Sequence, residues 1–407
     1  MRTPRALGET ELRQYWLLDP EVSFLNHGSF GACPIPVLEH QRQLRERLER
    51  QPVQFLARDL ESLLDEARRQ LAAFVGAAPE DLAWVSNATT GVNAVLQSLP
   101  FSPGDELLTT DHEYNACHNA LEFVARRAGA TVVVVAVPFP IASPDEVVGA
   151  VLSKATRRTR IALLDHVTSQ TGLVLPVRQL VRELAGRGID TLVDGAHAPG
   201  MLELALDDLG AAYFTGNCHK WVCAPKGAAF LHVRRDLRER VRPVVISHGA
   251  NSTRADRSRF HLEFDWVGTD DPTAVLCVPE AIRFMGSLLP GGWPELRRRN
   301  RQLAVQARDE LCRGLGIEPP CPDEMIGSMA ALPLPPGEPE ALASALYTDE
   351  LQSALIERWR IEVPIIPWPA PPWRLVRISA QIYNRPEQYR RLADALAELL
   401  AERELRR

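Results

Sequence analysis

Apolar runs of strand length alternate with amphipathic helical patterns from residue 60 to residue 233, and this rhythm limits the fold more than any other feature. Leu60, Leu64 and Leu71 recur at intervals that place them on one face of a helix. The expected strands cover residues 82–85, 106–110, 131–137, 160–165, 190–193, 212–215 and 228–233, and the expected helices cover 60–72, 91–99, 119–128 and 177–187. Strands this apolar, separated by helices, predict an α/β fold with a mostly parallel sheet covered on both faces.

Arginine-rich helical patterns and prolines replace this rhythm beyond residue 289. Helices are expected at 296–315, 348–358 and 385–406, with proline-rich loops around the second of them. We therefore expect a large α/β domain at 31–289 and a smaller α+β domain at 290–407. Residues 1–30 are expected to join the small domain to the active site.

The composition is that of an ordinary globular protein, with 407 residues of which 45% are hydrophobic and 24% charged. A net charge of -6 lacks the basic surplus that binding to a nucleic-acid backbone requires, so no nucleic-acid partner is expected. The longest apolar run, 131–137, is too short to cross a membrane, and residues 1–16 lack the apolar core of a secretory signal. Seven scattered cysteines argue against a disulfide framework and favour a reducing, cytoplasmic compartment.

Two strand ends carry charged residues that suggest chemistry. Asp194 follows the apolar strand 190–193, and Lys220 comes shortly after the strand 212–215. An isolated aspartate there is usually a cap or turn residue, but a lysine is rarely buried without a partner or a function. A strand-end lysine that follows a strand-end aspartate at this spacing is typical of a pyridoxal phosphate site. Lys220 would form the Schiff base, and Asp194 would keep the pyridine nitrogen protonated.

A phosphate-binding turn is expected at residues 87–91. Asn87, Ala88 and Thr89 follow the strand 82–85 and begin a helix, whose unpaired N–H groups and positive end suit an anion. Taken alone, the turn is explained as an ordinary helix cap. Together with Asp194 and Lys220, it supports pyridoxal 5'-phosphate as the cofactor.

Four segments carry a resemblance to a known family: Asn-Ala-Thr at 87–89, His-Val-Thr-Ser-Gln-Thr-Gly at 166–172, Asp-Gly-Ala-His at 194–197 and Asn-Cys-His-Lys-Trp at 217–221. They resemble the class V aminotransferase group of fold-type I pyridoxal phosphate enzymes, and the match spans nearly the whole chain. Within that group, residues 26–31 and 377–384 most resemble the isopenicillin N epimerase-like branch.

The resemblance implies roles in cofactor binding for the matching residues. Those placed on the phosphate are Thr89, Asn217 and His219, and those near the 3-hydroxyl group are Ser169 and His197. His112 matches the position that stacks an aromatic ring on the pyridine, with Tyr114 as the second choice. Thr269 matches a turn that reaches the phosphate across a dimer interface, which implies a homodimer with shared active sites.

The resemblance also implies how the substrate is held. Arg377 matches the arginine that binds the substrate α-carboxylate, a task that suits a guanidinium fork. A surface arginine on an apolar strand is the alternative explanation. Asn26 and Gly28 are expected beside the substrate. Three arginines at 254, 257 and 259 hint at an acidic substrate, although solvated loop charges explain them more simply.

The expected chemistry begins when freed Lys220 removes the substrate α-proton. The sequence leaves the fate of the resulting carbanion open. Epimerisation of an amino-acid or peptide α-centre is the first expectation, with His112 or Tyr114 as the second acid. A carbon–sulfur lyase acting on a cysteine conjugate or sulfoxide is the alternative, followed by an aminotransferase and a non-catalytic subunit.

Two other chemistries are not expected. The segment 362–377 contains no cysteine, and Cys321 comes too early to match the nucleophile of cysteine desulfurases. Cysteine and histidine cluster at 117–118 and 218–223, but paired Cys-x-x-Cys spacing is lacking, so no metal is expected.

Overall fold

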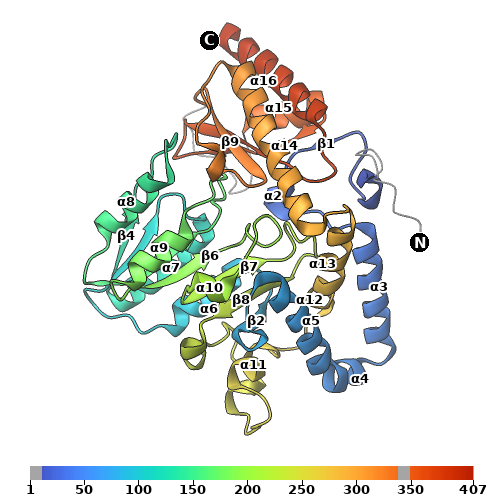
Figure 1. Cartoon of the computed structure of the whole chain (residues 1–407), viewed down its shortest axis with the longest axis vertical. Coiled ribbons are helices and arrows are strands. Elements are labelled where there is room, and N and C mark those ends of the chain that lie inside the picture. Colours follow the sequence, from blue (N-terminus) through green and yellow to red (C-terminus); the bar gives the residue numbers. More distant parts are fainter. Residues whose placement is uncertain (1–11, 338–348, 407) are drawn as a thin grey trace.

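The computed structural model describes residues 12–337 and 349–406 and places seven strands in one central sheet (Figure 1). They follow the order β2-β8-β7-β6-β5-β3-β4, with bounds β2 Leu82–Val85, β3 Glu106–Thr110, β4 Thr131–Val135, β5 Thr159–Asp165, β6 Asp190–Asp194, β7 Tyr213–Asn217 and β8 Ala229–Val233. Each strand overlaps a run expected from the sequence, so the predicted α/β fold is confirmed.

The strands of this sheet share one direction, with a single exception. β8 pairs antiparallel with both β2 and β7, whereas the remaining neighbours pair in parallel. The other six strands therefore point the same way, and their carboxyl ends meet at one edge of the sheet. This is the edge at which open α/β sheets bind their ligands.

Helices cover both faces of the sheet because successive strand residues point to opposite sides. Ile161 and Leu163 of β5 belong to one apolar core, and Ala162 and Leu164 belong to the other. The first core packs against α6 Ala88–Ser98 and α7 Asn115–Ala128, and the second against α5 Leu60–Val75, α8 Pro144–Lys154 and α9 Val177–Ala185. The continuous apolar runs of the sequence are explained by these two covered faces.

A second, antiparallel sheet forms further along the chain, from β9 Met329–Leu334, β11 Ile365–Pro367 and β12 Arg374–Ser379. It lies with α14 Gly292–Leu315, α15 Glu350–Trp359 and α16 Pro386–Arg406 at the top of Figure 1. The first residue expected in the helix 348–358 lies outside the described residues. The division into 1–30, 31–289 and 290–407 stays a prediction.

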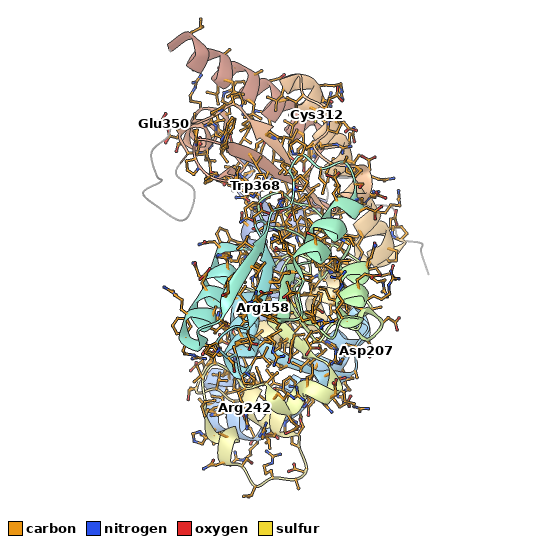
Figure 2. The ribbon with its side chains drawn as sticks, turned by 90° about the vertical axis from the view of Figure 1, so that its left-hand side faces the viewer. Arg158, Asp207, Arg242, Cys312, Glu350 and Trp368 are labelled. Atoms are coloured by element: carbon orange, nitrogen blue, oxygen red, sulfur yellow. The ribbon has the colours of Figure 1, made fainter. Side chains whose placement is uncertain are left out.

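Contacts between segments far apart in the sequence join this upper part to the rest of the molecule. β1 Ser23–Phe24 pairs in parallel with β10 Ile361–Glu362, which fixes the start of the chain against residues that come more than 300 positions later. Trp368 packs with Phe139, Ala331 and Leu375 at the level where the upper and lower parts meet (Figure 2).

No single helix among the residues described is long and apolar enough to span a membrane. The segment Thr273–Ser287 and the helix α14 pass the length and composition test only as a pair, and they are bent by 72°.

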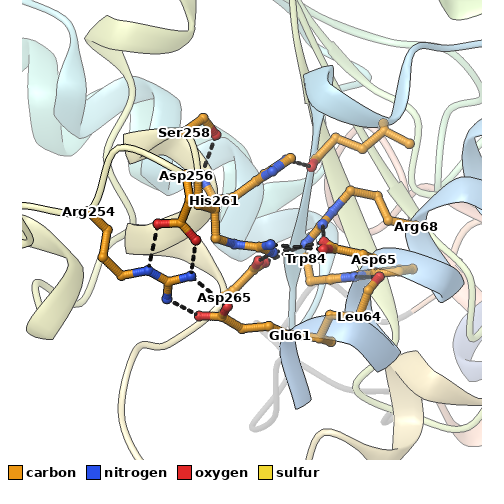
Figure 3. Close-up of polar contacts among 12 residues, drawn as sticks. Glu61, Leu64, Asp65, Arg68, Trp84, Arg254, Asp256, Ser258, His261 and Asp265 are labelled. Atoms are coloured by element: carbon orange, nitrogen blue, oxygen red, sulfur yellow. Dashed lines mark hydrogen bonds and ion pairs between the residues drawn. The ribbon is translucent and has the colours of Figure 1, made fainter. Parts of the chain in front are cut away.

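A buried ion-pair cluster fastens α5 to the loop and helix around residue 260 (Figure 3). The guanidinium group of Arg68 is almost fully buried between Asp65 and Asp265, and its distance to Asp265 is 2.5 Å. Arg257 contacts the same two carboxylates and lies 2.8 Å from Asp65. Two arginines and two carboxylates therefore neutralise one another, and water has little access to Arg68, Arg257 and Asp265 while Asp65 is partly exposed.

The other arginines of this loop also face carboxylates of their own chain. Arg254 lies between Glu61 and Asp256, at 2.6 and 2.7 Å (Figure 3). Arg259, at the start of α11 Arg259–Phe264, lies 3.4 Å from Glu263. The hint of an acidic substrate loses its support, because the charges that prompted it have partners within the fold.

Removing one partner of the buried cluster should destabilise the fold strongly. Asp265→Ala leaves the Arg68 and Arg257 guanidinium groups facing each other with one carboxylate, and we expect the free energy of unfolding to fall by about 3–5 kcal/mol. Asp256→Ala is the matched control, since the Asp256 pair is exposed and should leave stability unchanged within error. Urea unfolding followed by far-ultraviolet circular dichroism makes the comparison, and equal midpoints for both variants would refute it.

Candidate active site

The carboxyl edge of the sheet brings together nearly all the residues expected to bind the cofactor. They follow successive strands, with Ala88 and Thr89 after β2, His112 after β3, Ser169 after β5, Asp194 and His197 at the end of β6, and Asn217, His219 and Lys220 at the end of β7. Because these strands share one direction, segments separated by more than 100 residues meet in one place.

The turn expected to bind phosphate is held tightly against β7. The side-chain oxygen of Asn217 accepts a hydrogen bond from the Ala88 N–H at 2.8 Å. Gly91 allows close approach, because a Cβ there would come within 2.3 Å of the Thr215 hydroxyl oxygen. Asn217 thus positions the turn through the backbone of Ala88.

The start of α6 has the cap that the sequence predicts. The Asn87 side chain accepts from the Thr90 N–H at 2.8 Å, and Thr89 lies half-buried in the same turn. His219 Nδ1 donates to the carbonyl of Ala228 at 3.1 Å, and burial lowers the pKa of His219 to about 4. The histidine is therefore neutral near pH 7, and its Nε2 is left as an acceptor.

Lys220 lies in a chain of three polar side chains. Its Nζ is 3.0 Å from His197 Nε2, and the Trp221 Nε1–H donates to His197 Nδ1 at 3.4 Å. Burial lowers the pKa of Lys220 to about 7, and the positive charge of Arg377 adds to the effect. Burial also lowers the pKa of His197 well below its usual range, as does the charge of Lys220.

Asp194 ends β6 with its carboxylate buried and doubly hydrogen-bonded. Oδ1 accepts from the Ala196 N–H at 2.8 Å, and Oδ2 accepts from the Cys117 thiol at 3.1 Å. Burial raises the pKa of Asp194, while these two hydrogen bonds favour its ionised form. All the donors around it are neutral, so a cationic N–H group would complete its surroundings.

Two further carboxyl groups, whose burial the sequence does not predict, interact with Asp194. Burial raises the pKa of Glu113 and of Asp165 well above the ordinary range, and the charge of Asp194 adds to both shifts. Acidic oxygens of Glu113 and Asp194 and the Cys117 sulfur lie within 4.8 Å of one another. Glu113 follows the predicted His112 in a turn, and Asp165 is the last residue of β5. The sequence does not indicate that an acidic residue at such a position is buried.

His112 and Tyr114 have very different surroundings. His112 is 0% exposed, with Nε2 3.0 Å from the Val137 carbonyl and Nδ1 2.8 Å from the Thr171 hydroxyl. Its ring packs edge-on against Trp368 at a centroid distance of 4.7 Å. Tyr114, just before α7, is 42% exposed. Of the two aromatic candidates, Tyr114 is therefore the one whose side chain is accessible to solvent.

Arg377 projects from β12 and is fully buried among oxygen acceptors. Nη1 donates to the Ser169 carbonyl at 2.6 Å, and Nη2 donates to the Ser29 hydroxyl at 2.7 Å and to the Asn26 side-chain oxygen at 3.3 Å. The arginine thus links the second sheet, the start of the chain and the loop after β5. Arg377, Asn26 and Ser169 come together as expected, and Ser29 is an additional member.

Gly28 contributes backbone and space to this junction. Its N–H donates to the Ser379 hydroxyl at 3.0 Å, and a Cβ there would come within 2.4 Å of the Met329 sulfur. The residue therefore allows the start of the chain to pack closely on β9 and β12.

Thr269 lies apart from the other expected residues. It is exposed, and Gly268 before it adopts a φ of 131°, which favours glycine. Gly268 also lines a cavity of about 600 Å³ that reaches Ser86, Thr90 and Lys226. The cavity therefore extends from Gly268 to Thr90, in the turn expected to bind phosphate.

The donor and acceptor set fits pyridoxal phosphate. The first turn of α6 offers backbone N–H groups to a phosphate, and Lys220 offers an amine of low pKa to an aldehyde. The Asp194 carboxylate, held by neutral donors alone, suits a protonated ring nitrogen. These three groups project from the same sheet edge, as one cofactor spanning them requires.

Comparison with known sequences agrees with this geometry. The sequence pattern of the family described as aminotransferase class-V matches residues 34–392. The chain belongs to the class V aminotransferase family. An isopenicillin N epimerase from Amycolatopsis lactamdurans is 39% identical over 403 residues, which cover 95% of this chain and 97% of the relative. A probable chloroplastic L-cysteine desulfhydrase from Arabidopsis thaliana is 34% identical, and the match covers 93% of this chain and 83% of the relative.

Solved structures share the fold of this class V chain. A C-DES variant with glycine covalently linked to its pyridoxal phosphate has a TM-score of 0.78 at 21% identity, covering 95% of this chain and 99% of that one. A cysteine desulfurase from Thermococcus onnurineus has a TM-score of 0.78 at 18% identity, and the match covers 99% of this chain and 100% of that one. The fold is therefore that of the fold-type I pyridoxal phosphate enzymes, and pyridoxal 5'-phosphate is the cofactor of this class V enzyme.

Proposed function

We propose that this enzyme epimerises the α-centre of an amino acid or a peptide. The observation that carries the proposal is the placement of Lys220, an amine of low pKa at the carboxyl edge of the central sheet, near the buried guanidinium group of Arg377 from β12. The relationship to isopenicillin N epimerases, which spans almost the full length of both chains, supports this choice among the reactions open to the family.

The residues divide the work by position. Arg377 binds the substrate α-carboxylate through its guanidinium fork, with Asn26 and Ser169 holding that fork in place. Lys220 would hold the cofactor and, as a free amine, would take the proton from the α-carbon. Asp194 would favour a positive charge on the ring nitrogen. When bound, the cofactor supplies an electron sink for the electron pair left by the departing proton.

Inversion needs a second acid that returns a proton to the opposite face. We assign this role to Tyr114, whose side chain is accessible, and give it the position on the cofactor ring as well. His112 then has a structural role at the site. The Val137 carbonyl requires an N–H at Nε2, so Nδ1 accepts from Thr171 and the ring has no proton to deliver without breaking these bonds.

A carbon–sulfur lyase is the second candidate, because several relatives are named L-cysteine desulfhydrases. The same Lys220 would remove the α-proton, and a thiol or sulfenate would leave from the β-carbon. Persulfide chemistry of the desulfurase kind is disfavoured. All seven cysteines are buried, and burial raises the pKa of Cys321 to about 11 and of Cys33 to about 12.

The proposed assembly is a homodimer with shared active sites. The exposed side chains of Val244 and Val245 line the cavity that Gly268 also lines, Ile246 beside them is exposed as well, and a second copy would cover all three. Thr269 of each copy would then meet the cofactor phosphate of the other. Unpaired cysteines throughout fit the proposed cytoplasmic location.

Incubation with single amino acids and short peptides in deuterated water tests the function. Epimerisation requires deuterium at the α-carbon together with loss of chirality and no keto acid. Pyruvate and a released thiol from cysteine conjugates would instead establish the lyase. A purified protein that stays colourless after addition of pyridoxal phosphate would contradict both candidates.

Arg377→Ala should weaken recognition of the α-carboxylate. Loss of a charge-assisted fork costs about 3 kcal/mol, so kcat/KM should fall about 100-fold for every α-carboxylate substrate. Arg360→Ala is the control, because Arg360 is exposed beside Asp19. Steady-state kinetics on substrate and on its α-carboxamide separates the effects, since the amide should lose little more from the substitution. An equal loss for both would remove Arg377 from carboxylate binding.

A further inference from the structure

We propose that the Trp221 indole N–H fixes the tautomer of His197 and thereby keeps Lys220 in its neutral, nucleophilic form. The proposal deepens the proposed function and rests on Lys220 being the residue that anchors the cofactor. It makes Trp221 a positioning residue that acts on the lysine through His197.

The donor and acceptor roles along this chain follow from chemistry. An indole nitrogen can only donate, so His197 Nδ1, which lies 3.4 Å from Trp221 Nε1, must accept. A neutral imidazole that accepts at Nδ1 carries its proton at Nε2. That proton points at Lys220 Nζ across 3.0 Å, and only an uncharged amine has the lone pair to receive it. Each link therefore favours the neutral lysine.

The opposite tautomer would have the opposite effect. With its proton at Nδ1, His197 would present a lone pair at Nε2, which stabilises an ammonium group. The indole is well placed to prevent this, because Trp221 is 1% exposed and packs among Val167, Met201 and Met329. Its neighbours hold the donor toward Nδ1 in every state of the lysine.

Other titratable groups near Lys220 do not depend on the indole. The charge of Arg377 lowers the pKa of Lys220, and Asp194, Asp165 and Cys117 act in the opposite direction. His219 and His27 lie near His197. All of them remain in a Trp221→Phe variant, which keeps an aromatic ring and loses the N–H together with part of the indole bicycle. The substitution therefore removes the donor while the surrounding titratable groups stay in place.

Lysine chemistry in this chain is easy to follow, because the sequence contains only Lys154, Lys220 and Lys226. We would prepare cofactor-free full-length protein, label it with trace acetic anhydride from pH 5 to 11, and quantify each lysine by mass spectrometry. Exposed Lys154 serves as the internal standard. The Lys220 midpoint should lie near pH 7 in the wild type and about one pH unit higher in Trp221→Phe.

The control is Trp293→Phe, which removes an indole N–H bonded to the Ile282 carbonyl and should leave the Lys220 midpoint unchanged. Equal midpoints for Trp221→Phe and the wild type would overturn the proposal. If Trp221→Phe does not fold, the wild-type protein with ¹⁵N-labelled histidine decides, since a proton on His197 Nδ1 in its spectrum would refute the mechanism.

Failure of the proposed function has a different signature. Borohydride reduction of the cofactor-loaded enzyme, followed by peptide mapping, should place the pyridoxyl group on Lys220. A label on Lys226, or none, would show that the anchoring residue is wrong. A label on Lys220 with an unmoved Trp221→Phe midpoint would leave the function intact and reject the tautomer proposal alone.

Discussion

The Lys220→Ala enzyme should bind pyridoxal phosphate without a covalent bond and turn over at least about 10³-fold more slowly than the wild type. Two tasks are lost together, because the same amine anchors the cofactor and removes the α-proton. The visible absorption band of the covalently bound cofactor should disappear, while circular dichroism in the far ultraviolet stays unchanged.

Lys226→Ala is the matched control for this substitution. Lys226 lies six positions further along the chain and is exposed. Its ammonium group donates a hydrogen bond to the Gly31 carbonyl at 3.0 Å. Its removal should leave both the absorption band and most of the turnover in place. Full turnover by Lys220→Ala, or a band that survives in it, would remove Lys220 from the mechanism.

The location of the site could be predicted because it depends on strand direction alone. Apolar runs predict a parallel sheet, and a parallel sheet brings the residues after its strands to one edge. Asp194, Asn217 and Lys220 follow strands whose bounds the sequence places within two residues of those observed. The positions of these side chains need no knowledge of packing.

The buried acidic neighbours of Asp194 could not be predicted in this way. Cys117 lies on α7, and Glu113 lies in the turn before it. A cysteine or a glutamate near the start of a helix is not by itself a sign of a functional site. Their closeness to Asp194 depends on how α7 packs against β6, which the one-dimensional pattern does not contain. The bounds and pairing of β9 and β11 could not be predicted for a related reason, since prolines in or beside these strands hide short antiparallel pairings.

The choice between His112 and Tyr114 shows where motif position stops being informative. The two residues are separated by one position, and the motif favours His112 by alignment alone. Groups from distant segments bury the histidine. They are the Val137 carbonyl, the Thr171 hydroxyl and the Trp368 ring. Those segments are brought there by the tertiary fold, so only the structure distinguishes the enclosed ring from the accessible one.

Asp194→Asn should lower kcat at least about 100-fold, because an amide cannot stabilise the positive charge on the cofactor ring. The fold should survive, since asparagine has the same shape and its oxygen can still accept from the Ala196 N–H or the Cys117 thiol. The absorption maximum of the bound cofactor should shift, which reports on the ring nitrogen directly. Unchanged kcat and spectrum would assign the charge-stabilising role to another group.

Glu113→Gln is the critical comparison, because it removes a carboxyl group of the same cluster. Buried carboxyl groups this close do not all ionise, and burial together with the charge of Asp194 raises the pKa of Glu113 well above its ordinary range, which favours its neutral form. Glutamine preserves that neutral state, so kcat should change less than about threefold. A loss equal to that of Asp194→Asn would reverse the assignment of charge.

The same comparison predicts how stability depends on pH. Because the folded pKa of Glu113 lies above its unfolded value, folding takes up a proton once the pH exceeds the unfolded pKa, and stability falls as the pH rises. Glu113→Gln has no proton to take up at this position. Its free energy of unfolding should therefore decline less than that of the wild type between about pH 5 and 8, as urea unfolding at each pH would measure. An identical decline in both proteins would mean that Glu113 is ionised in the folded state. The negative charge of this cluster would then belong to Glu113 as well as to Asp194.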